Sequence, residues 1–286
     1  MLLIPAYAKV NLCLAVRGRR PDGFHEIDSV AVAVDWHDLV GIEARAAPAT
    51  AVRLRVTDGG GGEAPAGEDN LAARAAAAVA QLVGPMAVDV WLDKRIPSRA
   101  GLGGGSADAA AVLRGSDRWS GLDDQTRLAM AASLGSDVPV ALGCGAQRMR
   151  GRGEVLDAVP APTLFLAIAI AGTSDTTATY AATEEVDFED AGRVDHVLQA
   201  LAAGGLPDDG DLGSGLEPAA CRANPELDER LVALRAAIPQ VRWHLTGSGG
   251  AAFALAPDPA GAAEMAAAAR HAGFVGRACR TVAAVR

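Results

Sequence analysis

The sequence predicts an α+β fold, and three observations support this class. Segments that alternate apolar and polar residues indicate strands, whereas alanine-rich segments indicate helices. The two kinds are mixed without a regular strand–helix–strand repeat, which argues against a parallel α/β sheet. A strand, a glycine-rich loop and a helix also follow one another directly between residues 88 and 113. The 286 residues, 50% of them hydrophobic, suffice for one large domain or two closely joined ones.

The N-terminal region is expected to form antiparallel strands. Its apolar segments cover residues 2–4, 8–16 and 30–42. A basic turn, Arg17–Gly23, separates the second segment from the third. Val52–Val56 alternates cleanly and predicts another strand, and the glycine-rich residues 58–69 predict a mobile surface loop.

Helices and strands are both expected in the middle of the chain. Asn70 should cap a helix over Leu71–Val83, because asparagine accepts a hydrogen bond well at that position. Val88–Asp93 predicts a strand, and Ala107–Leu113 predicts a helix that ends near Gly121. The other elements expected here are a helix from Asp123 or Asp124 to Leu134, a strand-like Gln147–Arg150, and a buried central strand at Thr163–Ala171.

Beyond residue 176 the pattern becomes mainly helical. Residues 204–215 are polar and acidic and predict a loop. The further elements expected are strands at Val241–Leu245, Ala251–Leu255 and Val275–Val285 and a helix at Pro259–His271. A break near residues 150–165 suggests two domains, 1–155 and 156–286.

Composition and cysteine placement exclude several classes of protein. A net charge of −9 argues against general nucleic-acid binding, although one basic pocket for a phosphorylated ligand remains compatible with it. The four cysteines are far apart in the sequence, so a zinc site or a disulfide framework is not expected. The N-terminus lacks a signal-peptide pattern, and no apolar run reaches membrane-spanning length. We therefore expect a soluble, cytoplasmic protein without a protein-held metal ion.

The segment from Lys94 to Ala110 dominates the functional interpretation. It places a glycine loop between a strand and the start of a helix, where unpaired N–H groups and the helix dipole favour an anion. Lys94, Arg95 and Arg99 add positive charge. A P-loop requires a lysine directly after its glycines, and none follows them here. Ser106 stands where the dinucleotide-binding fingerprint has its third glycine, so neither standard pattern fits. The alternative is a flexible turn between two core elements.

Two further positions have both a structural and a functional interpretation. Strand alternation puts Lys9 and Asn11 on one face, where they could hold a phosphate and a hydroxyl, or simply face solvent. Asp137 precedes Val138 and Pro139, so it could be a helix cap or turn residue, or a carboxylate that faces the glycine loop.

Three motifs together make the chain resemble the GHMP kinase superfamily. They are Ala6–Leu12, Pro97–Ala110 and Leu245–Gly250. Within the superfamily, the chain is most similar to the kinases of 4-diphosphocytidyl-2-C-methyl-D-erythritol. The run Gly18–Glu26 is the most specific match, and Gly135–Pro139 and Asp69–Leu71 also fit, although Phe24 stands where a tyrosine is usual.

The resemblance implies a two-lobed fold, with an N-terminal ATP-binding lobe and a C-terminal substrate-binding lobe. It also implies ATP-dependent phosphorylation of the 2-hydroxyl of the methylerythritol unit in the non-mevalonate isoprenoid pathway, with ATP and Mg²⁺. Lys9 and Asp137 would be the catalytic pair. The implied substrate-binding residues are Asn11, Phe24, His25, Thr176 and Tyr180. The implied nucleotide-binding residues are Asn70, Lys94, Pro97, Ala100, Gly101, Leu102, Gly103, Gly104, Gly105 and Ser106.

Two alternative functions remain open from the sequence. One is a GHMP kinase for another small alcohol, such as homoserine or mevalonate, which would turn over without any cytosine. The other is a regulatory protein that binds a nucleotide but does not transfer a phosphoryl group; the presence of both Lys9 and Asp137 argues against it. Partners other than the two small molecules are not expected, and the chain should be a monomer or a weak dimer.

Overall fold

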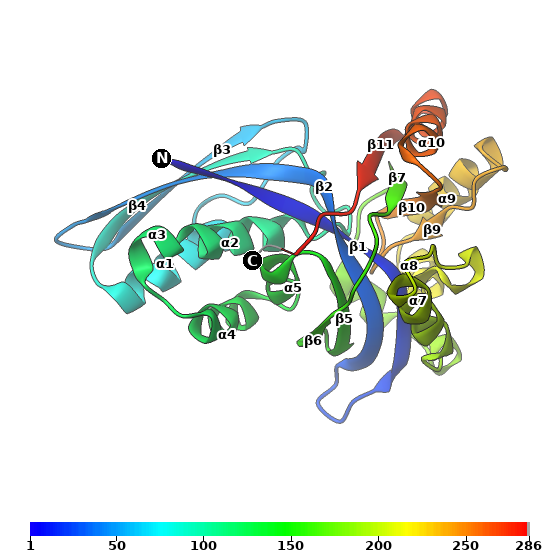
Figure 1. Ribbon diagram of the computed structural model, residues 1–286, viewed down its shortest axis with the longest axis horizontal. Coiled ribbons are helices and arrows are strands. Elements are labelled where there is room, and N and C mark those ends of the chain that lie inside the picture. The colour runs from blue at the N-terminus through cyan, green and yellow to red at the C-terminus, as the bar shows by residue number, and fades with distance from the viewer. Residues whose placement is uncertain (285–286) are drawn as a thin grey trace. The chain divides into compact units, whose positions relative to one another are not determined.

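The computed structural model describes residues 1–284, and the chain folds into two compact units (Figure 1). Unit 1 comprises residues 1–8, 36–98 and 103–143, and unit 2 comprises residues 9–35, 99–102 and the chain from residue 144 onward. This division differs from the predicted boundary after residue 155, because strands β1 (Leu2–Arg19) and β2 (His25–Ala46) contribute residues to both units. Strands and helices are mixed as expected, which confirms the α+β class.

Unit 1 is a sheet with helices packed on its apolar face. The C-terminal half of β2 pairs antiparallel with β4 (Met86–Lys94), and β3 (Ala51–Asp58) lies parallel to β4. The helices are η1 (Gly67–Asp69), α1 (Leu71–Val83), α2 (Gly104–Gly115), α3 (Asp117–Ser120), α4 (Asp124–Leu134) and α5 (Val138–Gly143). Buried alanines of α1 and α2 pack with the valines and leucine of β4, because small side chains let helices approach a sheet closely.

Capping side chains fix the helix ends in unit 1. Asn70 Oδ1 accepts a hydrogen bond of 2.9 Å from the Ala72 N–H at the start of α1. Asp123 Oδ1 accepts one of 2.7 Å from the Thr126 N–H at the start of α4. Both helices have the predicted extent, which confirms that local capping chemistry specifies them.

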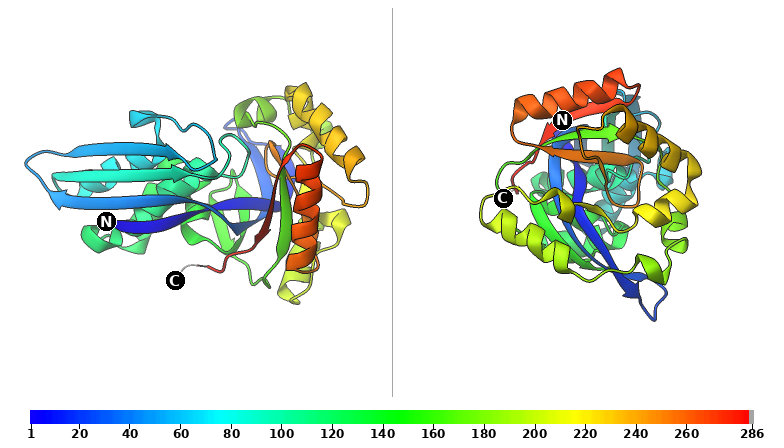
Figure 2. Two further views of the ribbon diagram at one scale, coloured as in Figure 1. Left: turned by 90° about the horizontal axis from the view of Figure 1, so that it is seen from above. Right: turned by 90° about the vertical axis from the view of Figure 1, so that its right-hand side faces the viewer.

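Unit 2 is organised around an antiparallel sheet with the strand order β11–β7–β10–β9 (Figure 2). The strands are β7 (Phe165–Ile170), β9 (His244–Leu245), β10 (Ala251–Ala256) and β11 (Val275–Arg280). Strand β7 is central and buried, as predicted. Helices α9 (Pro225–Ala237) and α10 (Pro259–His271) contribute to the apolar core on this sheet, around the fully buried Trp243. The helix predicted at Pro259–His271 is confirmed.

The remaining elements of unit 2 surround β1 and the N-terminal part of β2. Strand β5 pairs antiparallel with β2 and with β6. The elements are β5 (Ala146–Gly151), β6 (Val155–Ala158), α6 (Thr176–Ala181), η2 (Glu185–Asp187), α7 (Gly192–Ala202), η3 (Asp209–Asp211), β8 (Gly213–Ser214) and α8 (Glu217–Ala223). None of the helices within residues 1–284 is long and apolar enough to span a membrane.

Several predicted boundaries were wrong. The apolar segments 2–4 and 8–16 belong to one strand, β1, because the residues between them also keep an extended backbone. Residues 204–215 are not wholly irregular, because Gly213 and Ser214 pair in parallel with Cys13 and Leu14 of β1. The strand predicted at residues 241–245 is limited to β9, and the last strand ends at Arg280; residue 285 lies outside the described part of the chain.

Candidate active site

Lys9 and Asn11 lie side by side on β1 within unit 2, as strand alternation predicted. The Lys9 ammonium donates a hydrogen bond of 2.6 Å to Asn11 Oδ1. The Asn11 amide in turn donates to Ser29 Oγ at 2.8 Å, so its orientation is fixed, and its side chain is only 1% exposed. The Lys9 N–H also donates to the Leu102 carbonyl at 2.9 Å. A lysine ammonium and a carboxamide are therefore held together beside the glycine-rich segment.

The second glycine loop, Thr246–Gly250, packs directly against this pair. Thr246 Oγ1 accepts a hydrogen bond of 2.7 Å from the Asn11 N–H. Gly247 has a φ of 56°, and a Cβ at that position would lie 3.1 Å from Asn11 Oδ1 and 3.5 Å from Lys9 Nζ. Only glycine combines this backbone conformation with so close an approach. The loop therefore covers the Lys9–Asn11 pair with main-chain atoms.

The two glycine loops also meet backbone to backbone in unit 2. A Cβ on Gly250 would lie 2.7 Å from the carbonyl carbon of Ala100, closer than a Cβ can approach another atom without displacing it. A Cβ on Gly101 would collide with the carbonyl oxygen of Gly249. Portions of all three sequence motifs therefore converge within one compact unit.

Hydroxyl groups gather around Ser248 of the second loop. Its Oγ lies 2.8 Å from Ser174 Oγ and 2.9 Å from Thr176 Oγ1. The Ser248 carbonyl also accepts a hydrogen bond of 3.1 Å from the Thr179 hydroxyl. Thr176, predicted to bind substrate, is the first residue of α6 and is exposed. This cluster offers neutral donors and acceptors suited to a sugar hydroxyl or a phosphate oxygen.

Aromatic side chains form a second cluster in unit 2. The rings of His25 and Tyr180 are stacked, with their centroids 5.3 Å apart and an interplanar angle of 26°. Phe188 packs edge-on against His25 at 6.2 Å. Burial, and secondarily the charge of Arg19, lowers the pKa of His25, so the ring is neutral at pH 7. The structure thus brings together two of the three predicted base-binding residues.

Phe24, the third predicted base-binding residue, lies at the surface. It is 53% exposed, and the Arg152 guanidinium sits over its ring at 4.6 Å from the centroid. The Phe24 N–H donates to Asp22 Oδ1 at 3.1 Å, which holds the turn before β2. An exposed ring that already bears a cation is available for contact with a further flat group.

The first glycine loop leads into α2 as predicted. Gly103, with φ 69°, is the residue before the helix, and Gly104, Gly105 and Ser106 form its first turn. Their N–H groups therefore have no partner within the helix, and they lie at the positive end of its dipole. Ala100 and Leu102 are buried, whereas Pro97 is half-buried at the start of the loop. This arrangement can bind a phosphate group through main-chain amides.

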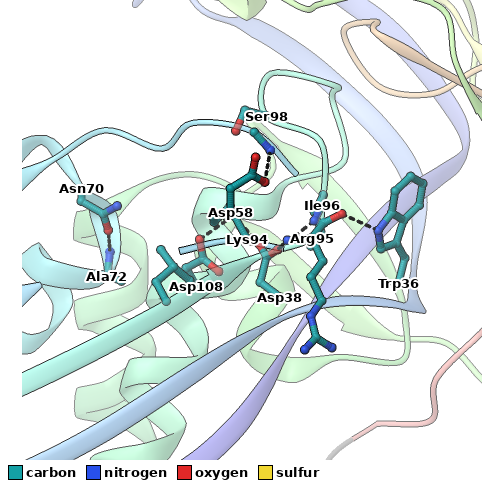
Figure 3. A network of polar contacts seen from close by, with 12 residues as sticks. Trp36, Asp38, Asp58, Asn70, Ala72, Lys94, Arg95, Ile96, Ser98 and Asp108 are labelled. Carbon is teal, nitrogen blue, oxygen red and sulfur yellow. Dashed lines mark hydrogen bonds and ion pairs between the residues drawn. The ribbon is translucent and has the colours of Figure 1, made fainter. Parts of the chain in front are cut away.

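Asn70 and Lys94 have their polar atoms committed to the protein itself (Figure 3). Asn70 caps α1 with its Oδ1 and donates from Nδ2 to the Pro65 carbonyl at 2.9 Å. The Lys94 ammonium pairs with the carboxylates of Asp38 and Asp108, and Lys94 is 3% exposed. The polar groups of both side chains thus have structural partners, and their predicted contact with a nucleotide stays a prediction.

Asp137 lies in unit 1, in the turn between α4 and α5. It is half-buried, and its carbonyl accepts a hydrogen bond of 3.1 Å from the Ala141 N–H in the first turn of α5. Lys9 belongs to unit 2, so its pairing with Asp137 stays a prediction. No cluster of three or more His, Cys, Asp or Glu side chains suited to a metal ion occurs within residues 1–284.

The sequence interpretation assigned no role to four residues that the structure places at these clusters. Ser248 joins the hydroxyl cluster, Arg152 covers Phe24, and Asp38 and Asp108 hold Lys94. A sequence signal exists for Asp108 and Ser248, because they lie within the motifs Pro97–Ala110 and Leu245–Gly250. The positions of Arg152 and Asp38 depend on contacts between distant segments.

Family comparison agrees with this geometry. Residues 70–145 match the model of the GHMP kinases N terminal domain. The chain is 37% identical over 285 residues to the 4-diphosphocytidyl-2-C-methyl-D-erythritol kinase of Cereibacter sphaeroides, covering 94% of this chain and 95% of that protein. It is 39% identical over 242 residues to the enzyme of the same name from Nocardia farcinica, covering 80% and 77%.

Comparison with solved structures gives the same result. A crystal structure of 4-(cytidine 5'-diphospho)-2C-methyl-D-erythritol kinase matches with a TM-score of 0.81 and 34% identity, covering 98% of this chain and 99% of the other. A homoserine kinase from Cytophaga hutchinsonii matches with a TM-score of 0.67 but only 16% identity over 99% of this chain and 95% of the other. The latter likeness shows the fold alone.

Proposed function

Because the chain belongs to the family of 4-diphosphocytidyl-2-C-methyl-D-erythritol kinases within the GHMP kinases, we propose that it transfers the γ-phosphoryl group of ATP to the 2-hydroxyl of that substrate. One observation of the structure carries the proposal. Segments of all three motifs, Lys9–Asn11, Ala100–Leu102 and Thr246–Gly250, are in contact within unit 2. They combine an ammonium group, a fixed carboxamide and two close-packed glycine loops.

The first glycine loop is proposed to bind the triphosphate of ATP. The residues fit such a group, because the start of α2 presents main-chain amides and the glycines leave no side chains in the way. Bound ATP would supply the phosphoryl group and Mg²⁺ would travel with it, held mainly by phosphate oxygens, as is usual for this ion. The phosphate oxygens would accept hydrogen bonds from the N–H groups of Gly103, Gly104, Gly105 and Ser106. The Ser106 hydroxyl would provide a further contact to the phosphates or to Mg²⁺.

Lys9, Asn11 and Asp137 are proposed to act at the reacting hydroxyl. The Asp137 carboxylate would accept the hydroxyl proton, and the Lys9 ammonium would stabilise negative charge on the transferred group. Asn11 Oδ1 accepts a hydrogen bond of 2.6 Å from the Lys9 ammonium, so Asn11 would orient the Lys9 side chain. In phosphoryl transfer such positioning and electrostatic stabilisation supply most of the acceleration.

The aromatic cluster is proposed to bind the cytosine ring. The neutral His25, stacked on Tyr180, would read the edge of the base, and the exposed Phe24 would stack on its face. Thr176, linked to Ser248, would contact the methylerythritol part. A site with polar groups matched to one base rejects ligands that leave those groups unpaired.

A coupled assay of ADP release tests the proposal directly. Purified protein, ATP, Mg²⁺ and 4-diphosphocytidyl-2-C-methyl-D-erythritol should release one ADP per product, and NMR of the product should show the phosphate on the 2-hydroxyl. Homoserine and mevalonate, offered in parallel, should not be turned over. ADP release with either alcohol but not with the cytidyl substrate would contradict the proposed specificity. ATP binding without transfer to any alcohol would support a non-catalytic protein.

The proposal also includes a cytoplasmic location and a monomeric or weakly dimeric state. The reaction needs only two small molecules, and their proposed contacts all come from one chain. Size-exclusion chromatography with light scattering at several protein concentrations measures the oligomeric state.

A further inference from the structure

Three ionisable side chains of unit 1 form a buried network between the end of β4 and the first turns of α2, the two segments that flank the first glycine loop in the sequence (Figure 3). Lys94 ends β4, Asp38 lies on β2, and Asp108 lies in the second turn of α2. Their exposed fractions are 3%, 0% and 2%. The Lys94 ammonium pairs with both carboxylates, at 2.8 Å in the case of Asp108 Oδ2. Charges removed from water this completely are costly unless each is well partnered.

Asp38 fixes the strand side of the loop. Its Oδ1 accepts hydrogen bonds from the N–H groups of Arg95 and Ile96, the latter at 2.8 Å, while its Oδ2 accepts from Lys94. The Arg95 carbonyl accepts a further bond of 2.8 Å from the Trp36 indole N–H. The backbone of residues 94–96 is therefore held by side chains of β2.

Asp108 fixes the helix side of the loop. It stands four residues after Gly104, the first residue of α2, and ties the first turns of that helix to Lys94. A Cβ on Gly104 would lie 3.2 Å from Ile96 Cγ2 and 3.4 Å from Lys94 Nζ. The first residue of α2 therefore lies close to the Lys94 ammonium. The side chain of Lys94 thus connects the end of β4 with the start of α2.

Two carboxyl groups share one ammonium group in this network. Although burial opposes the charge of Lys94, Asp108 and Asp38 together raise its pKa above the ordinary value. Burial raises the pKa of Asp108 above its ordinary value, whereas the charge of Lys94 lowers it. Asp108 Oδ1 is also the one atom of the network without a hydrogen-bond partner among the described residues. The negative charge of Asp108 therefore depends on the neighbouring Lys94 ammonium.

We propose that Lys94 is a positioning residue that shapes the phosphate-binding loop through Asp108 and Asp38, and that its ammonium does not itself contact the nucleotide. This inference rests on the proposed function, because it concerns the loop that would bind ATP. It makes a distinct statement about the mechanism, since a lysine near a phosphate loop would ordinarily be assigned a direct phosphate contact. Here the loss of Asp108 should have the same consequence as the loss of Lys94.

The test compares Lys94→Met with Asp108→Asn by isothermal titration with a non-hydrolysable ATP analogue and, separately, with cytidine diphosphate. Both variants should raise the Kd of the ATP analogue by about tenfold, equivalent to ~1.4 kcal/mol. The Kd of cytidine diphosphate should change by less than about twofold, because a folded unit 2 supplies its contacts. Asp108→Asn keeps the size of the side chain, so it remains informative if Lys94→Met folds poorly.

Arg45→Met is the matched control, because it removes a cation that pairs with Asp89 at 2.8 Å on the same sheet but at the surface. An exposed pair contributes little, so both Kd values should equal those of the wild type. If only one of Lys94→Met and Asp108→Asn loses affinity, or if neither does, the inference is overturned; loss in Lys94→Met alone would indicate a direct phosphate contact. A wild-type protein that does not bind the ATP analogue would instead contradict the proposed function.

Discussion

Replacing Gly250 by alanine should disturb the contact between the two glycine loops. The new Cβ would lie 2.7 Å from the Ala100 carbonyl carbon and 2.8 Å from both its Cα and its oxygen. To reach the 3.0–3.4 Å of a tight contact, the backbone of residue 100 must move by 0.3–0.7 Å (3.0 minus 2.7, and 3.4 minus 2.7). A misplacement of 1 Å can lower the rate of an enzyme about a hundredfold. A displacement of about half that distance should therefore weaken ATP binding and lower turnover by about tenfold.

Gly273→Ala separates this steric effect from backbone strain. Gly273 has a φ of 85°, close to the 93° of Gly250, and no atom lies within 4 Å of its added Cβ. Each substitution should cost ~1 kcal/mol of stability through the positive φ. Urea unfolding measures that common cost, and titration with an ATP analogue measures the difference. Equal ATP affinity in the two variants would refute the idea that contact between the loops shapes the nucleotide site.

Three further outcomes are expected. Asp137→Ala should lower kcat at least about a hundredfold while the ATP analogue still binds, and near-normal turnover would show that Asp137 is not the base. Phe24→Ala should raise KM for the cytidyl substrate with kcat little changed, and a fall in kcat at constant KM would contradict its contact with the base. Burial lowers the pKa of His244, so from pH 6.5 downward the unfolded chain binds a proton more readily than the folded one and stability falls. In His244→Phe, the loss of melting temperature between pH 7.5 and 5.5 should be smaller than in the wild type, and an equal loss would contradict this assignment.

Elements with local signals were predicted accurately from the sequence. The helices after Asn70 and Asp123 extend as expected because one side chain at each start accepts a main-chain N–H. The strand pairing of Gly213 with Cys13 was missed, since two hundred residues separate them and two residues carry no periodic pattern. No local pattern in β1 or β2 indicated that each strand would be divided between two compact units.

The candidate site was predictable in its motifs but not in its connections. The proximity of Lys9 and Asn11 followed from strand alternation, and the structure confirms it. The contacts of the half-buried Ser248 and the buried Asp38 were missed, because their partners come from segments far away in the sequence. Lys94 shows the limit most clearly, because a lysine before a glycine loop suggests an exposed cation, whereas the structure buries it between two carboxylates.

The glycines of both loops serve close packing more than flexibility. A flexible turn would tolerate a methyl group at most positions, as Gly210 should, because no atom lies within 4 Å of an added Cβ there. Gly101 and Gly250 instead face main-chain atoms of the opposite loop, and Gly104 faces Ile96 and Lys94. Each glycine thus removes a side chain at a point where two segments meet. Such a loop can hold its main-chain amides in place before a ligand arrives, and preorganised donors are what electrostatic stabilisation of a transferred phosphoryl group requires. The packing therefore favours a catalytic cradle over a flexible connection.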